Sequence, residues 1–446
     1  MYDLAIIGGG PAGYTAAAKA SGHGLSVVLF ERETLGGTCL NVGCIPTKAL
    51  LYGSKMYSHA KSGDKFGVAA ADVSYDFTKM QQRKTRVVRR LVAGVKQQVA
   101  SATVVNADAH VVNYKSHVIT IIAGDDIYEA SNLLICTGSE NAVPPVAGID
   151  LPHVLDSTGA LALDLVPEKA VVVGGGVIGI EFAQLWNNLG AKVTVVEMLP
   201  SILANLDGDV SNAVLQSLKK QGVNFMLETR VESISADAVH TDKGTVAADC
   251  VLVCTGRRPN MSGVEALNLP FEGRLLSLDD HQRTPLPGVY AAGDVTGRLM
   301  LAHTASRQAE VAVNNMLGID DIMRYDDVPS VVYCDPEVAA VGLTEAQAKE
   351  KYGENGVFCA KIPMLYAGRF AAENEGEQGL CKMLADKDGR IVGVHMVGNT
   401  SSEIIATAAM AITARMTAGQ LTRVVFPHPT VSEILKSAAE EISSQS

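Results

Sequence analysis

Two stretches of the chain share one order of apolar, glycine and polar positions. Residues 2–13 (YDLAIIGGGPAG) and 168–179 (EKAVVVGGGVIG) each hold a short apolar run followed by Gly-x-Gly-x-x-Gly. An unbroken apolar run of this length is typical of a buried parallel strand, and helix-compatible residues follow in both copies. A second apolar run then ends in Glu31 or Glu197, each 18 residues past the third glycine. The pattern predicts two βαβ units.

The two copies continue alike but differ in length. A later apolar run ends at Ser139 (NLLICTGS) in the first copy and at Arg257 (CVLVCTGR) in the second. The first copy carries about 48 more residues between its glycine loop and this run. A strand-and-turn pattern at 287–297 (PGVYAAGDVTG) is too far along the chain to complete the second sheet. We therefore expect the chain to return to the first domain there.

From about Val328 the pattern changes to alternating apolar positions, which favour an antiparallel sheet. Helical segments are expected near 401–417 and 430–442. The predicted fold class is α/β, with two Rossmann-like dinucleotide-binding domains, the second inserted in the first, and a C-terminal α+β domain. The expected boundaries are 1–143 with 264–327 for the first domain, 144–263 for the second, and 328–446 for the third.

Charge and composition narrow the classes of partner. The chain has 48 acidic and 37 basic side chains, which argues against a broad nucleic-acid interface or an anionic membrane partner. A content of 47% hydrophobic and 19% charged residues excludes an intrinsically disordered chain. No apolar run approaches the ~20 residues that span a bilayer, and the N-terminus lacks the basic region of a secretory signal. We expect a cytoplasmic chain, or a mature organellar one.

The glycine loops point to dinucleotides. Such glycines allow a tight turn and let the backbone approach a pyrophosphate at a helix N-terminus. Glu31 and Glu197 stand where a carboxylate accepts a hydrogen bond from a ribose 2′-OH and repels a 2′-phosphate, so the second site is predicted to prefer NAD. The first unit, with its extra residues and Asp294, is the better candidate for a flavin. The glycines concerned are Gly8, Gly10 and Gly13, and Gly174, Gly176 and Gly179.

Cys39 and Cys44 lie in GGTCLNVGCIPTK, five positions apart. A structural zinc site is a weak interpretation because a second ligand pair is missing. A disulfide needs Cα atoms within about 7 Å, whereas residues five apart on an ideal helix are roughly 8.6 Å apart. The segment must therefore leave ideal geometry, and Gly43 and Pro46 allow this. A redox-active disulfide and two buried free thiols both stay open. The other six cysteines are predicted to be small buried hydrophobes.

Over essentially its whole length the chain resembles class I pyridine nucleotide–disulfide oxidoreductases, and among them the dihydrolipoamide dehydrogenases. The resemblance rests on GGGPAG, GGTCLNVGCIPTK, GGGVIGIE, CTGRRPN, AAGDVTG, MLAHTASRQ and FPHPTVSE, in the family's order. The cysteine motif and the C-terminal HPTxxE are highly specific, while the glycine motifs occur in many oxidoreductases.

The resemblance implies FAD and NAD as cofactors and gives roles to individual residues. Cys39 resembles the thiol that reacts with the substrate, and Cys44 the thiol beside the flavin. His428 resembles the acid–base, oriented by Glu433. Lys48 and Glu181 resemble an ion pair near flavin and nicotinamide, and Asp294 resembles the carboxylate at the flavin ribitol. The positions that match the family's cofactor contacts are Thr38, Lys48, Ala109, Gly138, Asp294, Ala302, Ile178, Glu181, Val231 and Gly256.

His428 also stands out from the residues alone. It lies between Pro427 and Pro429, which restrict the backbone, and base chemistry on a dithiol needs a group that titrates near neutrality. The alternative for Thr430-x-x-Glu433 is a capping box, with Thr430 as N-cap and Glu433 at N3. The two roles are compatible in part, because Thr430 can cap while Glu433 holds the imidazole.

The implied activity is the oxidation of protein-bound dihydrolipoamide, with electrons passing through a Cys39–Cys44 disulfide and FAD to NAD+. The implied partners are a second copy of the chain, joined through the C-terminal domain, and a lipoyl domain of a 2-oxo acid dehydrogenase or glycine-cleavage complex. No metal, nucleic acid or membrane is expected. Two rivals stay open: an NAD(P)H-dependent reductase of another low-molecular-weight disulfide, and a non-catalytic FAD-binding redox-sensing subunit.

Overall fold

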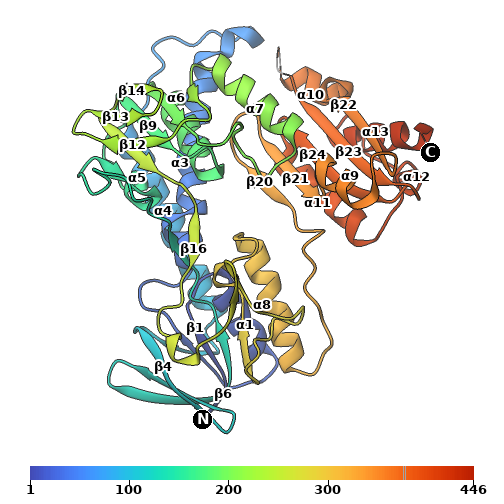
Figure 1. Cartoon of the computed structure of the whole chain (residues 1–446). Helices are drawn as coiled ribbons and strands as arrows, with labels where there is room; N and C mark the ends of the chain where they lie inside the picture. The colour runs from blue at the N-terminus through green and yellow to red at the C-terminus, as the bar shows by residue number, and fades with distance from the viewer. Residues whose placement is uncertain (375, 377, 446) are drawn as a thin grey trace. The chain divides into compact units, whose positions relative to one another are not determined.

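The computed structural model describes residues 1–374, 376 and 378–445. The chain divides into two compact units, each built from three segments (Figure 1). The first unit comprises Met1–Ala49, Lys79–Ala142 and Gly256–Tyr325, and the second comprises Leu50–Thr78, Val143–Thr255 and Asp326–Ser446.

The first unit is built on a seven-stranded sheet. Its parallel part runs in the order β3-β2-β1-β6, with β19 also parallel to β6, and an antiparallel hairpin of β5 and β4 continues from β6. The pairing of β19 with β6 confirms that the chain returns to this domain. The strands are β1 (Tyr2–Ile7), β2 (Val27–Phe30), β3 (Thr103–Val105), β4 (Ala109–Lys115), β5 (Val118–Ala123), β6 (Asp126–Ile135) and β19 (Val289–Ala291).

Both faces of this sheet are covered, which explains the unbroken apolar run of β1. Leu4 and Ile6 enter a hydrophobic cluster on one face, whereas Ala5 and Ile7 enter a second cluster on the other. The first cluster packs against helices, and the second against β4, β5 and the loops after Gly263. The helices of this unit are α1 (Pro11–Gly22), α2 (Gly37–Val42), the first turns of α3 (Cys44–Lys61), most of α4 (Phe77–Gln98) and α8 (Ala302–Met316).

The second unit repeats the βαβ arrangement. A parallel five-stranded sheet has the order β11-β10-β9-β15-β8, and a small antiparallel sheet has the order β12-β13-β14. The elements are β8 (Val154–Leu155), α5 (Ser157–Leu161), β9 (Lys169–Val173), α6 (Val177–Asn188), β10 (Lys192–Val196), α7 (Gly208–Lys220), β11 (Asn224–Met226), β12 (Val231–Ile234), β13 (Ala238–Thr241), β14 (Gly244–Ala247) and β15 (Cys250–Val253).

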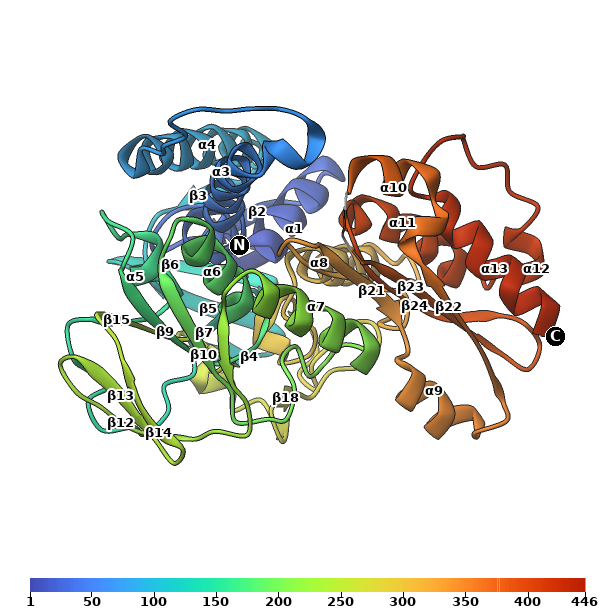
Figure 2. The same ribbon diagram turned by 90° about the horizontal axis from the view of Figure 1, so that it is seen from above.

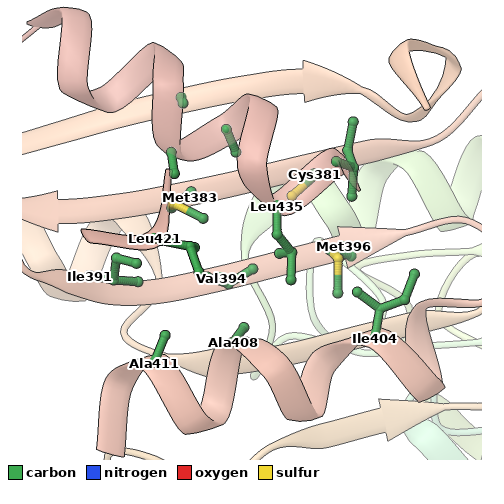
Figure 3. Close-up of a cluster of buried hydrophobic side chains, with 14 of the residues drawn as sticks. Cys381, Met383, Ile391, Val394, Met396, Ile404, Ala408, Ala411, Leu421 and Leu435 are labelled. Carbon is green, nitrogen blue, oxygen red and sulfur yellow. The ribbon is translucent and has the colours of Figure 1, made fainter. Parts of the chain in front are cut away.

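The C-terminal part of the second unit holds an antiparallel sheet of order β20-β21-β24-β23-β22, as predicted. Cys381, Met383, Val394 and Met396 point from its central strands into a core that α11 and α13 cover (Figures 2 and 3). The elements are β20 (Ser330–Val332), β21 (Val338–Gly342), α9 (Glu345–Tyr352), β22 (Val357–Pro363), α10 (Gly368–Glu373), β23 (Leu380–Asp386), β24 (Ile391–Val397), α11 (Ser401–Thr413), α12 (Ala418–Leu421) and α13 (Glu433–Gln445).

Two details here differ from the sequence prediction. The helix expected at 401–417 ends at Thr413, because Arg415 adopts a left-handed φ of 53° and the chain begins a separate helix after Thr417. The helix expected from residue 430 begins three residues later, at Glu433. The remaining short elements are η1 (Gly63–Phe66), β7 (Ser139–Asn141), β16 (Arg257–Pro259), η2 (Glu265–Leu267), β17 (Phe271–Glu272), β18 (Leu275–Leu276), η3 (Asp294–Thr296) and η4 (Met364–Tyr366).

Lys382 lies on the opposite face of the C-terminal sheet, next to its cross-strand neighbour His395. Its side chain is only 2% exposed, and its Nζ lies 2.7 Å from Asp207, 2.8 Å from Asp209 and 2.6 Å from Glu345. The two aspartates belong to the start of α7 and the glutamate to α9. Burial opposes its charge, but hydrogen bonds to these carboxylates raise the pKa of Lys382. One buried ammonium thus joins the nucleotide-binding part of this unit to the C-terminal sheet.

Replacing Lys382 with methionine is expected to destabilise the chain by about 3–5 kcal/mol, because three carboxylates lose their buried partner. The measurement is denaturant unfolding at neutral pH, and Lys361→Met is the matched control. Lys361 contacts Asp209 and Glu345 but is half exposed, so its loss should cost only about 0–1 kcal/mol. Equal losses in both variants would contradict this account.

The carboxylates around Lys382 make the stability of the folded chain depend on pH. The hydrogen bond from Lys382 lowers the pKa of Glu345 from its ordinary 4.5 to about 2. A carboxyl whose pKa is depressed in the folded chain stabilises it above the unfolded-state pKa and loses that contribution as pH falls. Stability from Glu345 is therefore complete at neutral pH and declines between about pH 5 and pH 2.

Candidate functional site

The two cysteines of the CxxxxC motif lie at a break between two helices. Helix α2 ends at Val42, Gly43 adopts φ −142° and ψ −112°, and α3 begins at Cys44. A Cβ on Gly43 would lie 2.8 Å from the Thr38 carbonyl oxygen, so a side chain there would block the close return of the backbone. The predicted departure from ideal helical geometry is confirmed.

This break brings the two thiols together. Both are free, Cys39 half-buried and Cys44 exposed, and the Cys39 thiol is hydrogen-bonded to Cys44. That hydrogen bond and burial raise the pKa of Cys39 well above its ordinary value, although the nearby Lys48 ammonium opposes the shift. Cys39 therefore holds its proton at neutral pH, and its use as a nucleophile requires a base.

The other cysteines are partly as predicted. Four are buried, whereas Cys254 and Cys359 are only partly so. Burial raises the pKa of every one of these thiols, to about 12 for Cys381. Their chemistry is that of protonated, unreactive side chains.

The two glycine loops have matching backbone geometry. Gly10 precedes α1 with φ −73° and ψ −170°, and Gly176 precedes α6 with φ −77° and ψ −177°. A Cβ on Gly13 would lie 1.8 Å from the Gly8 carbonyl oxygen, and one on Gly179 would lie 2.1 Å from that of Gly174. No side chain caps either helix, so the first N–H groups are available to an anion. Both loops fit a dinucleotide pyrophosphate.

The glutamates after each second strand are held in the same way. Glu31 accepts hydrogen bonds from the N–H groups of Gly9 (2.8 Å) and Glu33 (2.8 Å). Glu197 accepts from Gly175 (2.6 Å) and from the residue two positions on, Leu199 (2.8 Å). Each carboxylate is thereby fixed against its glycine loop with lone pairs left for a ribose hydroxyl. This arrangement fits the role expected of both residues.

Asp294 belongs to a hydrogen-bond network that sequence reasoning missed. The Ser139 hydroxyl donates to Asp294 (2.5 Å). Arg257 donates through Nε to the Ser139 hydroxyl (2.7 Å), through Nη2 to the Ser139 carbonyl (2.7 Å) and through Nη1 to Asn141 (2.6 Å). Pairing of β7 with β16 places these residues side by side. The sequence holds one indication of this network, because Ser139 and Arg257 end the equivalent apolar runs of the two copies.

The other expected cofactor contacts lie at loop ends and element starts. Glu181 is buried on α6 and accepts a hydrogen bond from the Tyr333 N–H (3.1 Å). Its ion pair with Lys48 stays a prediction. Of the rest, Thr38 lies in α2, Ile178 in α6, Ala109 begins β4, Val231 begins β12, Ala302 begins α8, and Gly138 and Gly256 follow β6 and β15.

His428 and Glu433 meet as expected. His428 Nδ1 lies 3.0 Å from a carboxylate oxygen of Glu433, whose other oxygen accepts from the Thr430 N–H (2.8 Å). These contacts lower the pKa of Glu433, which keeps it ionised beside the imidazole. The Thr430 hydroxyl donates to the Pro427 carbonyl (2.8 Å), and α13 starts at Glu433 itself. One of the two bonds of the capping box, from the Thr430 N–H to the Glu433 carboxylate, is present, whereas the Thr430 hydroxyl donates to Pro427.

The described part of the chain contains neither a metal-binding cluster nor a membrane-spanning helix. Among residues 1–374, 376 and 378–445, no group of three or more His, Cys, Asp or Glu side chains could hold a metal ion. Within the same ranges, no helix is both long and apolar enough to cross a membrane.

Comparison with known proteins places these features in a family. Residues 2–309 match the model for pyridine nucleotide-disulphide oxidoreductases, and residues 328–439 match the model for the dimerisation domain of those proteins. Dihydrolipoyl dehydrogenase 1, mitochondrial, of Arabidopsis thaliana is 39% identical over 98% of this chain and 89% of its own.

Two further matches cover nearly the whole chain. Dihydrolipoyl dehydrogenase 3 of Pseudomonas aeruginosa is 38% identical, with 99% of this chain and 98% of its own covered. The crystal structure of LpdA from Mycobacterium tuberculosis is similar with a TM-score of 0.91 and 26% identity, and covers 99% of both chains. The α/β fold with a C-terminal dimerisation domain is thus confirmed.

Proposed function

Because the chain belongs to the pyridine nucleotide-disulphide oxidoreductases, FAD- and NAD-dependent enzymes, we propose that it oxidises protein-bound dihydrolipoamide to lipoamide with NAD+ as acceptor. The observation that carries the proposal is the hydrogen-bonded pair Cys39 and Cys44 at a helix break, in a chain with two dinucleotide loops. Relatives named dihydrolipoyl dehydrogenase at 36–39% identity support this substrate over other disulfides.

The cysteine pair exchanges bonds with the substrate. With Cys39 and Cys44 joined as a disulfide, one substrate sulfur attacks Cys39 and displaces the Cys44 thiolate. The second substrate sulfur then attacks the first and displaces Cys39, so lipoamide leaves and two thiols remain. Bound FAD supplies the redox chemistry that takes two electrons from the reduced pair and delivers hydride to NAD+.

The substrate thiols must give their protons to a base, and we propose His428 as that base. Its Nδ1 is fixed by the ionised Glu433, which leaves Nε2 available for proton transfer and stabilises the imidazolium. The matched dimerisation domain supports a homodimer. We propose that His428 of a second copy serves Cys39 of the first.

The proposed function is tested by NADH formation from dihydrolipoamide, measured against reduction of glutathione disulfide by NADPH and NADH. Turnover of dihydrolipoamide with NAD+ in a yellow, FAD-containing protein is the expected result. Turnover of glutathione disulfide alone would favour the reductase alternative. Bound FAD without turnover of either substrate would favour the redox-sensing subunit. Rates with lipoyl domains from a 2-oxo acid dehydrogenase and from a glycine-cleavage complex distinguish these two sources of the protein substrate.

Replacing Glu197 with alanine is expected to narrow the preference for NAD over NADP by about tenfold or more. The carboxylate is fixed by Gly175 and Leu199, accepts from a 2′-OH and repels a 2′-phosphate. The measurement is kcat/KM with each nucleotide. Glu168→Ala is the matched control, since it removes an exposed glutamate just before β9 in the same unit and should leave the preference unchanged. Equal efficiency with both nucleotides in the unaltered protein would contradict the role.

A further inference from the structure

Helix α4 carries an unusual charge for this chain. Its 22 residues, FTKMQQRKTRVVRRLVAGVKQQ, include seven lysines and arginines and no aspartate or glutamate. The whole chain, by contrast, has more acidic than basic side chains. Basic side chains thus gather on this helix although the net charge of the chain is negative, so the field of α4 has the opposite sign to that net charge.

The charges form a row opposite the packed face. Lys79, Arg83, Arg86 and Arg90 follow the spacing i, i+4, i+7, i+11, and all four are exposed. The hydrophobic side chains that bury the helix lie on the other side. Like charges three or four residues apart destabilise a helix, and opposite charges would have stabilised it. Arg86 and Arg90, four residues apart in this row, therefore do not stabilise the helix by their charges, which points to binding.

Several of these cations have no acidic partner in the fold. Among the residues that the structure describes, Arg86, Arg89, Arg90 and Lys96 form no ion pair, and all four are exposed. Their charges are consequently available to an anionic group outside the chain. These four cations extend over eleven residues of helix, about 15 Å, which is about half the diameter of a small domain.

From Lys79 on, helix α4 lies in the first unit with the redox pair, and its Arg83 donates through Nη1 to the carbonyl of Ala49 (3.0 Å), five residues after Cys44. Val95 and Val99 are buried in the same hydrophobic cluster as Leu40, the residue after Cys39. Ile45, the residue after Cys44, packs against that cluster. A domain bound to the exposed face of α4 is therefore held on the unit that carries the two thiols.

We propose that the basic face of α4, defined by Arg86, Arg89, Arg90 and Lys96, binds the acidic surface of the carrier domain that presents the dithiol to Cys39. The inference rests on the proposed function and names the surface that its protein substrate uses. A compact acidic domain fits better than nucleic acid or a lipid surface, because those extended polyanions would also meet the acidic remainder of the chain.

The test compares two substrates of one active site: free dihydrolipoamide and an isolated, acidic dihydrolipoyl domain. In the variant Arg86→Glu with Arg90→Glu, kcat/KM for the domain is expected to fall about tenfold or more, since charge steering is worth about 10–10³ in association rate. The value for free dihydrolipoamide should change less than about twofold. The loss should appear mainly in KM, and added salt should lower the rate of the unaltered enzyme more than that of the variant.

Two controls keep the outcome decisive. The variant Lys115→Glu with Lys192→Glu makes the same change of net charge at two exposed lysines, one at the end of β4 and one at the start of β10. It should leave kcat/KM unchanged for both substrates. Arg86→Gln with Arg90→Gln, a milder change, should give a smaller loss with the domain only. Equal effects on both substrates, or equal effects of the control pair, would overturn the inference. Failure of the unaltered enzyme to oxidise free dihydrolipoamide would instead overturn the proposed function.

Discussion

Replacing Cys39 with serine is expected to lower NADH formation from dihydrolipoamide about 10⁴-fold or more, the scale seen when a covalently reacting residue is removed. Serine cannot form the disulfide, so the substrate electrons have no route to the cofactors. Cys44→Ser should have an effect of the same size, because the helix break at Gly43 brings the two sulfurs together and either one alone cannot complete the exchange.

A second reaction separates this loss from misfolding. Reduction of an artificial one-electron acceptor by NADH needs both nucleotide sites but neither cysteine, and it should survive in both variants. Cys136→Ser is the matched control, because its thiol is buried and its raised pKa keeps it protonated. Substantial NADH formation from dihydrolipoamide by Cys39→Ser would contradict the assigned role.

Replacing His428 with alanine is expected to lower the same rate by about 10²–10⁴, the usual worth of a general base. The substrate thiols must lose their protons before they attack, and the raised pKa of Cys39 favours its departure as a protonated thiol, so the reaction needs a group that accepts and returns a proton. Glu433→Gln should cost less, because the amide still accepts from His428 but no longer stabilises an imidazolium. FAD content should be unchanged in both variants, since the glycine loops lie elsewhere in the chain.

Mixing the two inactive chains tests whether the site is shared. Under conditions that exchange subunits, a dimer of one Cys39→Ser chain and one His428→Ala chain would hold one site with both defects and one intact site. Activity approaching half the native value per mixed dimer supports a site built from two copies. No recovery despite demonstrated exchange would mean that each chain uses its own histidine, or that His428 is not the base.

The sequence by itself determined those features in which the interacting residues are close along the chain. The two glycine loops and the glutamates 18 residues after them could be predicted, because a strand, a tight turn and a helix fix their backbone positions locally. The break between Cys39 and Cys44 also followed from Gly43. His428 and Glu433, five residues apart, were expected to meet and do so.

The sequence was less informative where the local pattern is compatible with more than one secondary structure. The strand β22 (Val357–Pro363) was not among the apolar stretches recognised, because its residues are mostly half-buried at a sheet edge and their pattern is weak. The start of α13 was placed three residues early because the chain first forms tight turns, with the Ile434 N–H bonded to Val431 (3.2 Å) and the Leu435 N–H to Ser432 (3.1 Å), and the regular helix begins only at Glu433.

Only the tertiary structure decided the contacts between distant segments. Arg257 reaches Ser139 over 118 residues, and Ser139 reaches Asp294 over 155, through the pairing of β7 with β16. Lys382 reads as an exposed lysine in an alternating strand, yet it is buried against carboxylates of α7 and α9. Periodicity reports which face of an element is buried, but the partner that a polar side chain meets depends on strand register and helix packing, which no local pattern encodes.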